Sequence, residues 1–378
     1  MKNTGTKVGG DPPKYQRILT ELRHSISVGQ VKPGDRLPSE NELGGRFSVS
    51  RLTVQRALKE LQIEGLVDRR AGSGTYVLPR KESSGKLFGL LIPGLGETEI
   101  FEPICQGMAK AGRSGGHALL WGHAIHAGDE DKEFLAQQLC ADYIARRVSG
   151  VFFAPMEGFP TKDAFNLSIV DRLSAAGIAV VLLDRCIFKW PNRSRFDLVG
   201  IDNRRGGNQV ARHLLNHGVK RPVFLARPNS APTVDQRFAG FAEALRSHGL
   251  DPGEMIRADP ASQTCVRQIL DTRRPDAFVC ANDRTAATLM QTLETLGLEV
   301  PKDVRITGFD DVRYSNLLRV PLTSLRQPCK EIGETAILAM LSRLDQPNLP
   351  ARDILLDCKL VVRKSCGSDI VVNTDLTM

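Results

Sequence analysis

Apolar residues near the N-terminus recur every three or four positions, which is the period of amphipathic helices. The run Tyr15–Ile26 follows this pattern and stops before Gly29. Ser39 and Glu42 have the spacing of a capping box, so a second helix should begin there. Ser50 can cap a third helix in the same way. The pattern therefore predicts three short helices with a tight turn between the second and the third.

Two short strands are predicted after these helices. Leu66–Arg70 and Gly74–Val77 flank Ala71-Gly72-Ser73, which reads as a glycine-containing hairpin turn. Three helices followed by such a hairpin form the plan of a winged helix-turn-helix, in which the third helix enters the major groove of DNA.

Further along the chain, apolar runs typical of buried strands alternate with amphipathic helical stretches, which predicts an α/β body with parallel sheets. Because about 280 residues exceed the usual size of one sheet domain, we expect two lobes. The expected strands include Leu87–Pro93, Ala118–Trp121, Gly150–Ala154, Ala179–Asp184, Leu198–Ile201, Pro222–Ala226, Ala277–Cys280 and Val304–Gly308.

A polar, aperiodic stretch separates the two patterns. The expected organisation is a DNA-binding domain over residues 1–78, a linker over 79–86, a two-lobed domain over 87–366 and a C-terminal tail over 367–378. We have no functional interpretation of the tail.

The uneven distribution of charged residues along the chain supports this division. Residues 1–86 contain 16 Lys and Arg against 9 Asp and Glu, a net of +7 out of +8 for all 378 residues. A basic small domain on a nearly neutral large one favours nucleic-acid contact by the small domain.

The N-terminus leads into no apolar signal segment, and no apolar run reaches the length of a membrane span. The eight scattered cysteines are typical of a reducing compartment. We expect a cytoplasmic protein, associated with the nucleoid.

The third predicted helix carries most of the candidate DNA contacts. Ser50 and Thr53 can bond phosphate, and Arg51 can bond phosphate or a guanine edge. Leu52 is an exposed apolar residue that suits a thymine methyl group. A solvated helix surface is the alternative interpretation for a lone arginine. The candidates are Arg36, Ser50, Arg51, Leu52, Thr53, Gln55, Arg56, Arg70 and Gly72.

Residues 14–78 resemble the DNA-binding domain of the GntR family of bacterial regulators. The matching motifs are Pro33-Gly34-Asp35-Arg36-Leu37-Pro38-Ser39-Glu40, Val49-Ser50-Arg51-Leu52-Thr53-Val54 and Gly72-Ser73-Gly74-Thr75-Tyr76-Val77. The resemblance implies DNA contacts by Arg36, Ser50, Arg51, Leu52, Thr53 and Gly72. Many members have arginine where this chain has Gln55.

Polar residues follow several predicted strands of the body, at the strand ends where ligands bind in open α/β sheets. They are Asp184, Arg237, Asn282-Asp283, Asp310-Asp311 and Gln327. Carboxylates, an arginine and amides together suit the hydroxyl groups of a sugar. Asp283 and Asp311 have an alternative interpretation as helix N-caps. No glycine-rich phosphate loop follows a strand, and the histidines lack metal or triad spacing. We therefore expect no catalytic residues, no metal and no cofactor.

The body, from Leu87 to Cys366, resembles the effector domain of the LacI family, a two-lobed relative of periplasmic sugar-binding proteins. Its markers include Arg237-Phe238-Ala239-Gly240-Phe241, Asn282-Asp283, Val300-Pro301-Lys302-Asp303-Val304 and Gly308-Phe309-Asp310-Asp311. The resemblance implies ligand contacts by Asp184, Arg237, Asn282, Asp310 and Gln327, with the loop Glu97–Phe101 adding Glu97 and Phe101 from the other lobe.

A GntR-type head on a LacI-type body is the architecture of the arabinose-repressor group. We therefore expect a transcriptional regulator that binds double-stranded operator DNA as a homodimer, does not contact membranes, and is switched by a small-molecule effector, expected to be a sugar. Repression of carbohydrate-utilisation genes is the expected outcome. The alternatives are a transcriptional activator and a cytoplasmic sugar-binding module; an enzyme is not expected.

Overall fold

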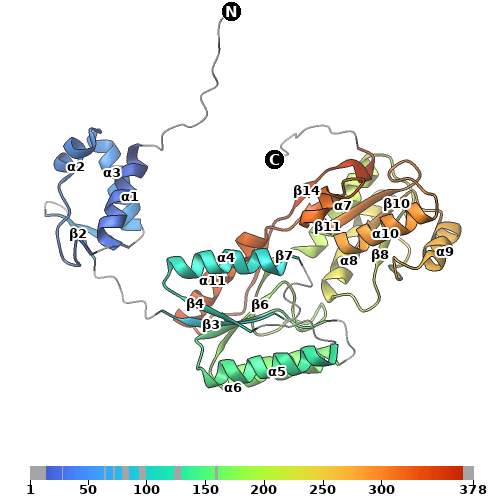
Figure 1. The fold of residues 1–378 in the computed structure, drawn as a ribbon, viewed down its shortest axis with the longest axis horizontal. Helices are drawn as coiled ribbons and strands as arrows, with labels where there is room; N and C mark the ends of the chain where they lie inside the picture. The colour runs from blue at the N-terminus through green and yellow to red at the C-terminus, as the bar shows by residue number, and fades with distance from the viewer. Residues whose placement is uncertain are drawn as a thin grey trace, which may run out of the picture. The chain divides into compact units, whose positions relative to one another are not determined.

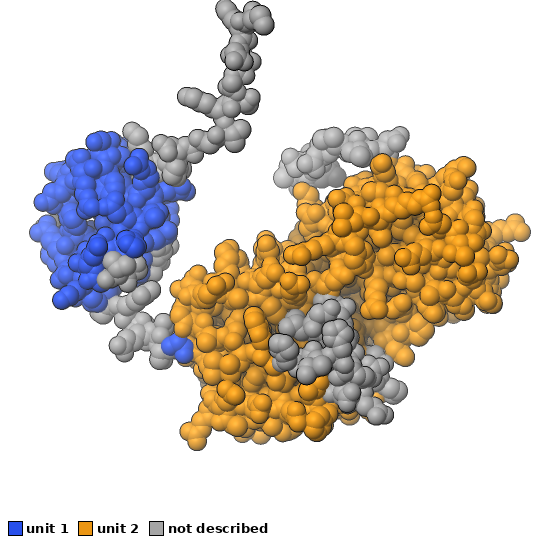
Figure 2. Space-filling view, in the orientation of Figure 1, with its two compact units in different colours: residues 1–85 blue, residues 86–378 orange. Residues whose placement is uncertain are grey.

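The computed structural model describes residues 14–27, 29–63, 65–70, 73–78, 85–92, 99–122, 129–157 and 161–368. The chain divides into two compact units, residues 1–85 and 86–378 (Figure 2). We call them the head unit and the body unit. None of the helices in the described ranges is long and apolar enough to cross a bilayer.

The head unit contains the three predicted helices and the predicted hairpin. Its elements are α1 (Lys14–Ser27), α2 (Glu40–Phe47), α3 (Arg51–Ile63), β1 (Val67–Arg70) and β2 (Gly74–Val77). The capping box is confirmed, because the Ser39 hydroxyl accepts from the Glu42 amide at 3.3 Å and the Glu42 carboxylate accepts from the Ser39 amide at 2.7 Å. The helices enclose a small core of buried apolar residues from all five elements and from Leu37.

The segment before α2 extends the hairpin by one strand. The Gly34 amide donates to the Val77 carbonyl, and the Leu37 amide donates to the Thr75 carbonyl, both at 2.8 Å. Arg36 forms an isolated bridge with Tyr76 between them. The hairpin is thereby attached to the start of the helix-turn-helix.

The body unit contains two six-stranded sheets, one in each lobe, which confirms the two-lobed α/β prediction (Figure 1). In lobe 1 the sheet order is β13 (Asp353–Leu356), β7 (Asp197–Ile201), β6 (Ala179–Leu183), β5 (Gly150–Phe153), β3 (Leu87–Leu91), β4 (Ala118–Trp121). In lobe 2 it is β14 (Lys359–Val361), β12 (Thr323–Arg326), β11 (Arg305–Asp310), β10 (Ala277–Cys280), β8 (Pro222–Ala226), β9 (Ile256–Arg257). Neighbours are parallel except β12 and β14.

Helices cover both faces of each sheet, as Figure 1 shows for lobe 1, where α4 and α11 lie on one face and α5 and α6 on the other. The body helices are α4 (Phe101–Ser114), α5 (Asp129–Ala145), α6 (Lys162–Ala175), α7 (Asn203–Asn216), α8 (Pro232–Ser247), α9 (Gln263–Arg273), α10 (Asp283–Thr295) and α11 (Cys329–Asp345). In lobe 2, α7 and α8 approach so closely that a Cβ at Gly207 would collide with the Arg237 carbonyl.

All eight expected strands are present, with ends displaced by no more than two residues. β9, β12, β13 and β14 were not predicted. Of these, β12 is the instructive case, because its buried residues Thr323 and Ser324 are polar. The Thr323 amide donates to the Ser365 hydroxyl at 2.8 Å, and the Ser324 hydroxyl donates to Asp283 at 2.6 Å. These hydrogen bonds replace the apolar pattern by which a buried strand is recognised.

Within residues 161–368 the chain crosses between the lobes three times. The crossings lie between β7 and α7, between β12 and α11, and between β13 and β14. The residues there are Asp202, Gln327-Pro328 and Asp357-Cys358. Asp202 caps α7 by accepting from the Arg205 amide at 2.9 Å.

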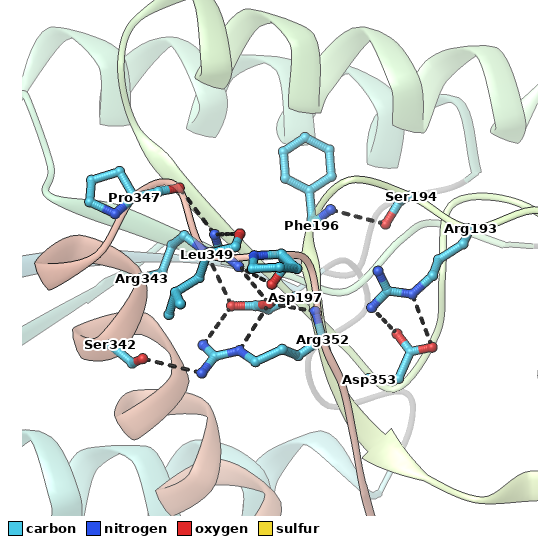
Figure 3. Close-up of polar contacts among 11 residues, drawn as sticks. Arg193, Ser194, Phe196, Asp197, Ser342, Arg343, Pro347, Leu349, Arg352 and Asp353 are labelled. Atoms are coloured by element: carbon cyan, nitrogen blue, oxygen red, sulfur yellow. Dashed lines mark hydrogen bonds and ion pairs between the residues drawn. The ribbon is translucent and has the colours of Figure 1, made fainter.

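A buried ion cluster joins the returning C-terminal segments to lobe 1 (Figure 3). Asp197, fully buried at the start of β7, pairs with Arg343 of α11 at 2.8 Å and with Arg352 before β13 at 2.9 Å. Burial raises the pKa of Asp197, but hydrogen bonds from Arg352 and Arg343 outweigh this and hold the pKa below its usual value. The cluster is therefore ionised at neutral pH.

Asp197→Asn should lower the free energy of unfolding of the body unit by about 3 kcal/mol, because two partly buried arginines lose their partner. Urea denaturation of the full chain measures this. Asp171→Asn is the matched control, since the Asp171–Arg195 pair is more than half exposed and should contribute less than about 1 kcal/mol. Because the folded-state pKa is depressed, the D197N deficit should shrink as the pH falls below about 4. Equal stability of the two variants would contradict the assignment.

Candidate nucleic-acid interface and ligand cleft

The N-terminal turn of α3 presents the predicted contact residues to solvent. Arg51 and Leu52 are exposed, and the Leu52 side chain is 76% accessible, which is unusual for leucine. The Ser50 hydroxyl lies 2.9 Å from the Thr53 hydroxyl and accepts from the Thr53 amide at 3.4 Å. The structure therefore groups Ser50, Arg51, Leu52 and Thr53 at one helix end.

Glu40, the first residue of α2, organises this surface. Its carboxylate accepts hydrogen bonds from Arg51 Nε at 2.7 Å and Gln55 Nε2 at 3.0 Å on α3. Arg69 Nη2 on β1 donates to its other oxygen at 2.7 Å. The hydrogen bond from Arg51 is the largest influence on the Glu40 carboxyl, and although burial opposes it, the pKa lies below its usual value. One ionised carboxylate thus links both helices and the hairpin.

Glu40 and Arg69 were not predicted. Glu42, not Glu40, is the acidic residue of the predicted capping box, and Arg69 lies in a predicted strand for which no partner was expected. The available signal was an acidic residue in the first turn of one helix, opposite an arginine in the first turn of the next.

The hairpin places further arginines beside this cluster. Arg70 pairs with Asp68 at 3.0 Å, and its guanidinium lies 4.9 Å from the ring centre of Tyr76. The backbone at Gly74 packs so tightly on Arg36 that a Cβ there would lie 2.5 Å from Arg36 Nε. A cavity of about 550 Å³ has four arginines in its lining: Arg36, Arg51, Arg69 and Arg70. Gly72, also a predicted DNA contact, lies outside the described residues.

Arg56 is not part of this group. Its guanidinium lies over the Tyr15 ring of α1, 4.2 Å from the ring centre. A DNA contact by Arg56 remains a prediction, and the structure does not bring it to the cluster around Glu40.

In the body unit, three predicted ligand residues meet at the end of β11. Gln327 Nε2 donates to Asp310 at 2.7 Å, and Arg237 Nη1 lies 3.7 Å from the same carboxylate oxygen. Arg237 is buried on α8, where Nε donates to Asn203 at 2.8 Å and Nη1 donates to the Ala281 carbonyl at 2.7 Å. Its guanidinium also lies 3.7 Å from the ring centre of Phe309.

The Asp310 carboxyl has an unusual proton affinity. Burial raises its pKa to about 7, although the charge of Arg237 and the hydrogen bond from Gln327 act in the opposite direction. The charges of Asp283 and Asp184 contribute to the increase. Asp184 belongs to lobe 1 and Asp310 to lobe 2, so carboxylates of both lobes contribute to this pKa shift.

On the lobe 1 side, Asp184 follows β6 in a left-handed conformation with φ 65°. It accepts from the buried Arg185 at 2.9 Å, and Arg185 also pairs with Glu157 at 2.6 Å. The Arg185 guanidinium lies 6.0 Å from the ring centre of Phe101, which is itself almost fully buried. Arg185 and Glu157 were not predicted; the signal for Arg185 was its position directly after Asp184.

Asn282 caps α10, because its side-chain oxygen accepts from the amide and the hydroxyl of Thr285 at 2.9 and 2.8 Å. The alternative interpretation of Asp283 and Asp311 as N-caps is wrong. Asp283 is buried and accepts from Ser315 at 2.5 Å and from Ser324. Asp311 pairs with Arg326 at 2.6 Å.

A cavity of about 820 Å³ opens between the lobes. Asp310 and Gln327 line it from lobe 2 and the second crossing, and Tyr314 lies beside them. Glu99 and Ile100, just before α4, line it from lobe 1. Asp184, Arg237, Asn282 and Phe101 are not in its lining, and Glu97 lies outside the described residues. Burial raises the pKa of both Glu99 and Tyr314 above their usual values.

Comparisons with known proteins agree with this arrangement. Residues 14–77 match the family model for bacterial regulatory proteins of the gntR family, and residues 211–366 match that for the periplasmic binding protein-like domain. The arabinose metabolism transcriptional repressor of Geobacillus stearothermophilus is 28% identical over 367 residues, which cover 93% of this chain and 97% of that protein.

Two further comparisons extend over most of the chain. The HTH-type transcriptional repressor CytR of Escherichia coli (strain K12) is 24% identical over 323 residues, covering 84% of this chain and 88% of that one. The solved structure of the transcriptional regulator CelR–cellobiose complex matches with a TM-score of 0.63 and 23% identity, covering 83% and 90% of the two chains.

The chain is thus a transcriptional regulator in which a gntR-type winged helix-turn-helix domain precedes a periplasmic-binding-protein-like domain of the LacI type.

The raised pKa of Asp310 predicts how stability depends on pH. A carboxyl whose pKa is higher in the folded state stabilises the fold below its unfolded pKa of about 4 and loses this contribution as the pH rises through about 7. Asp310→Asn keeps an oxygen that accepts from Gln327 but cannot ionise. Between pH 5 and pH 8 the wild type should lose about 3 kcal/mol relative to this variant, measured by urea denaturation. If the free energies of unfolding of the wild type and of Asp310→Asn changed in parallel with pH, the raised pKa of Asp310 would be contradicted.

Proposed function

We propose that the protein represses carbohydrate-utilisation genes, binds operator DNA as a homodimer, and is switched by a sugar bound between the lobes of the body unit. The observation that carries the proposal is the combination of the arginine-rich surface around Glu40 in one unit with the acid, arginine and amide cluster around Asp310 in the other. The names of the relatives, which include an arabinose metabolism repressor, support it.

The head unit provides two kinds of DNA contact. Ser50 and Thr53 are placed to bond phosphate, and Arg51 keeps both terminal nitrogens for a guanine edge because Glu40 takes its Nε. The net charge of +7 over residues 1–86 supplies a general attraction to the backbone. Two such heads on a symmetric dimer would bind a pseudo-palindromic operator.

The cleft chemistry favours a neutral, hydroxyl-rich effector. Two buried arginines outside the lining of the cavity already have carboxylate partners: Arg185 pairs with Asp184 and Glu157, and Arg237 lies beside Asp310. A phosphate or carboxylate on the ligand would have to compete for them. Hydroxyl groups both donate and accept, so they can join such a network without adding charge.

The three crossings between the lobes form the hinge about which the lobes open and close. A sugar held by both lobes favours one degree of closure, and it changes operator affinity only if it binds the two closure states unequally. Couplings of this kind typically amount to 1–3 kcal/mol. We expect a cytoplasmic protein without catalytic turnover, because its relatives are regulators that act on DNA.

Arg51→Ala should weaken binding to a promoter fragment from the protein's own locus by about tenfold or more. Fluorescence anisotropy with the full chain measures this, and the thermal midpoint should stay unchanged because Arg51 is exposed. Arg212→Ala, which removes an exposed arginine of the body unit, is the matched control and should bind like the wild type.

Wild-type affinity should also fall steeply with salt concentration, because neutralised phosphates release counterions. Unchanged binding by the Arg51 variant, or an affinity that does not depend on salt, would refute the DNA-binding role of this surface.

A further inference from the structure

The carboxylate of Glu40 fixes the orientation of the Gln55 amide. The oxygen and nitrogen of a glutamine amide have nearly the same shape, so shape alone does not orient them. An ionised carboxylate, however, only accepts hydrogen bonds. The group of Gln55 that lies 3.0 Å from Glu40 must therefore be the nitrogen, and the amide oxygen points away from Glu40.

The Glu40 carboxylate is fully engaged, which keeps this geometry in place. Arg51 Nε and Gln55 share one oxygen, while Arg69 donates to the other. The Glu40 side chain is only 19% exposed, so water competes weakly for these bonds. The low pKa of Glu40 agrees with a charged acceptor at neutral pH.

Gln55 retains one donor and one acceptor for a ligand. One N–H is used by Glu40, and within the described residues no other group bonds the second N–H or the amide oxygen. Gln55 lies on α3 one turn after Arg51, so both side chains emerge on the same face of the helix. That face also carries the exposed Leu52.

A free acceptor beside a free donor matches the major-groove edge of adenine. The amide oxygen accepts from adenine N6, and the remaining N–H donates to N7, which makes two hydrogen bonds. Cytosine offers only its N4 donor, so it would leave the second N–H unpaired. Guanine offers two acceptors, which would oppose the outward amide oxygen.

We propose that Gln55 is a specificity-determining residue that recognises an adenine next to the base contacted by Arg51, and that Glu40 is the positioning residue that holds its amide for this contact. The proposal rests on the DNA-binding function proposed above and adds the base that the second turn of α3 reads.

Selection from a randomised duplex DNA library with the full chain tests the proposal. The wild type should enrich a half-site with adenine at one position beside the base that depends on Arg51. Gln55→Ala should lose the preference at this position alone, and Gln55→Arg should change it to guanine. Replacing the adenine by another base in the selected duplex should weaken wild-type binding by about tenfold to a hundredfold. Replacing it by 7-deazaadenine, which lacks N7, should weaken it in part.

Gln268→Arg is the matched control, because it adds the same charge at an exposed glutamine of the body unit. It should enrich the wild-type sequence. Glu40→Gln tests the positioning role: it keeps the side-chain shape but removes the acceptor-only character, so the adenine preference should relax. The thermal midpoint should fall, because Arg51 and Arg69 lose a charged partner, while circular dichroism at the assay temperature should match the wild type and show that the variant is folded.

The outcomes separate the two levels of the proposal. If the wild type enriches no sequence, the DNA-binding function fails and the adenine contact with it. If a sequence is enriched but no position changes in the Gln55 variants, or the position that changes is cytosine, only the recognition role of Gln55 is overturned. An unchanged adenine preference in Glu40→Gln overturns the positioning role of Glu40.

Discussion

A charged side chain removed from water must be stabilised by a partner of opposite charge or by hydrogen bonds, or must become neutral, because the effective cost of burying it alone is several kcal/mol. This constraint shapes every region of the molecule that we connect with function. It places Glu40 among Arg51, Gln55 and Arg69 in the head unit. In the body unit it sets Arg237 beside Asp310 and Arg185 between two carboxylates, and it anchors the C-terminal segments on Asp197. The arrangement of each functional group follows from its partner.

Pairing also decides what these groups can still bind. Arg51 donates its Nε to Glu40, and no other group in the described residues bonds its terminal nitrogens, so it presents a forked donor to a base rather than an unoriented charge. The buried arginines Arg185 and Arg237 are paired with carboxylates of the protein, so an anionic ligand would have to compete for them. A raised pKa at Asp310 adds a group that is partly protonated near neutral pH and can therefore donate as well as accept. Such a site suits the mixed donors and acceptors of sugar hydroxyls.

Local patterns predicted the elements better than the contacts between them. The helices of the head unit, the capping box at Ser39 and the eight apolar strands all follow from short-range spacing, which a sequence displays directly. Strand β12 does not, because its buried polar residues Thr323 and Ser324 bond Ser365 and Asp283, at distant positions in the chain. Glu40, Arg69, Glu157 and Arg185 were missed for the same reason: their roles arise from pairs that only the fold brings together. Asn282 was predicted as a ligand contact, and only the structure shows that its side chain caps α10.

The proposed switch requires coupling between the cleft and the DNA surface, and operator affinity measured with and without a sugar tests this coupling most directly. A panel of neutral pentoses, hexoses and disaccharides, with the matching sugar phosphates and uronic acids, would be added to the full chain on its promoter fragment. At least one neutral sugar should shift the affinity by about 5- to 150-fold, and Asp310→Ala should abolish the shift while it still binds DNA. A neutral sugar that binds the protein and leaves the DNA affinity unchanged would contradict the account, as would a response confined to anionic ligands.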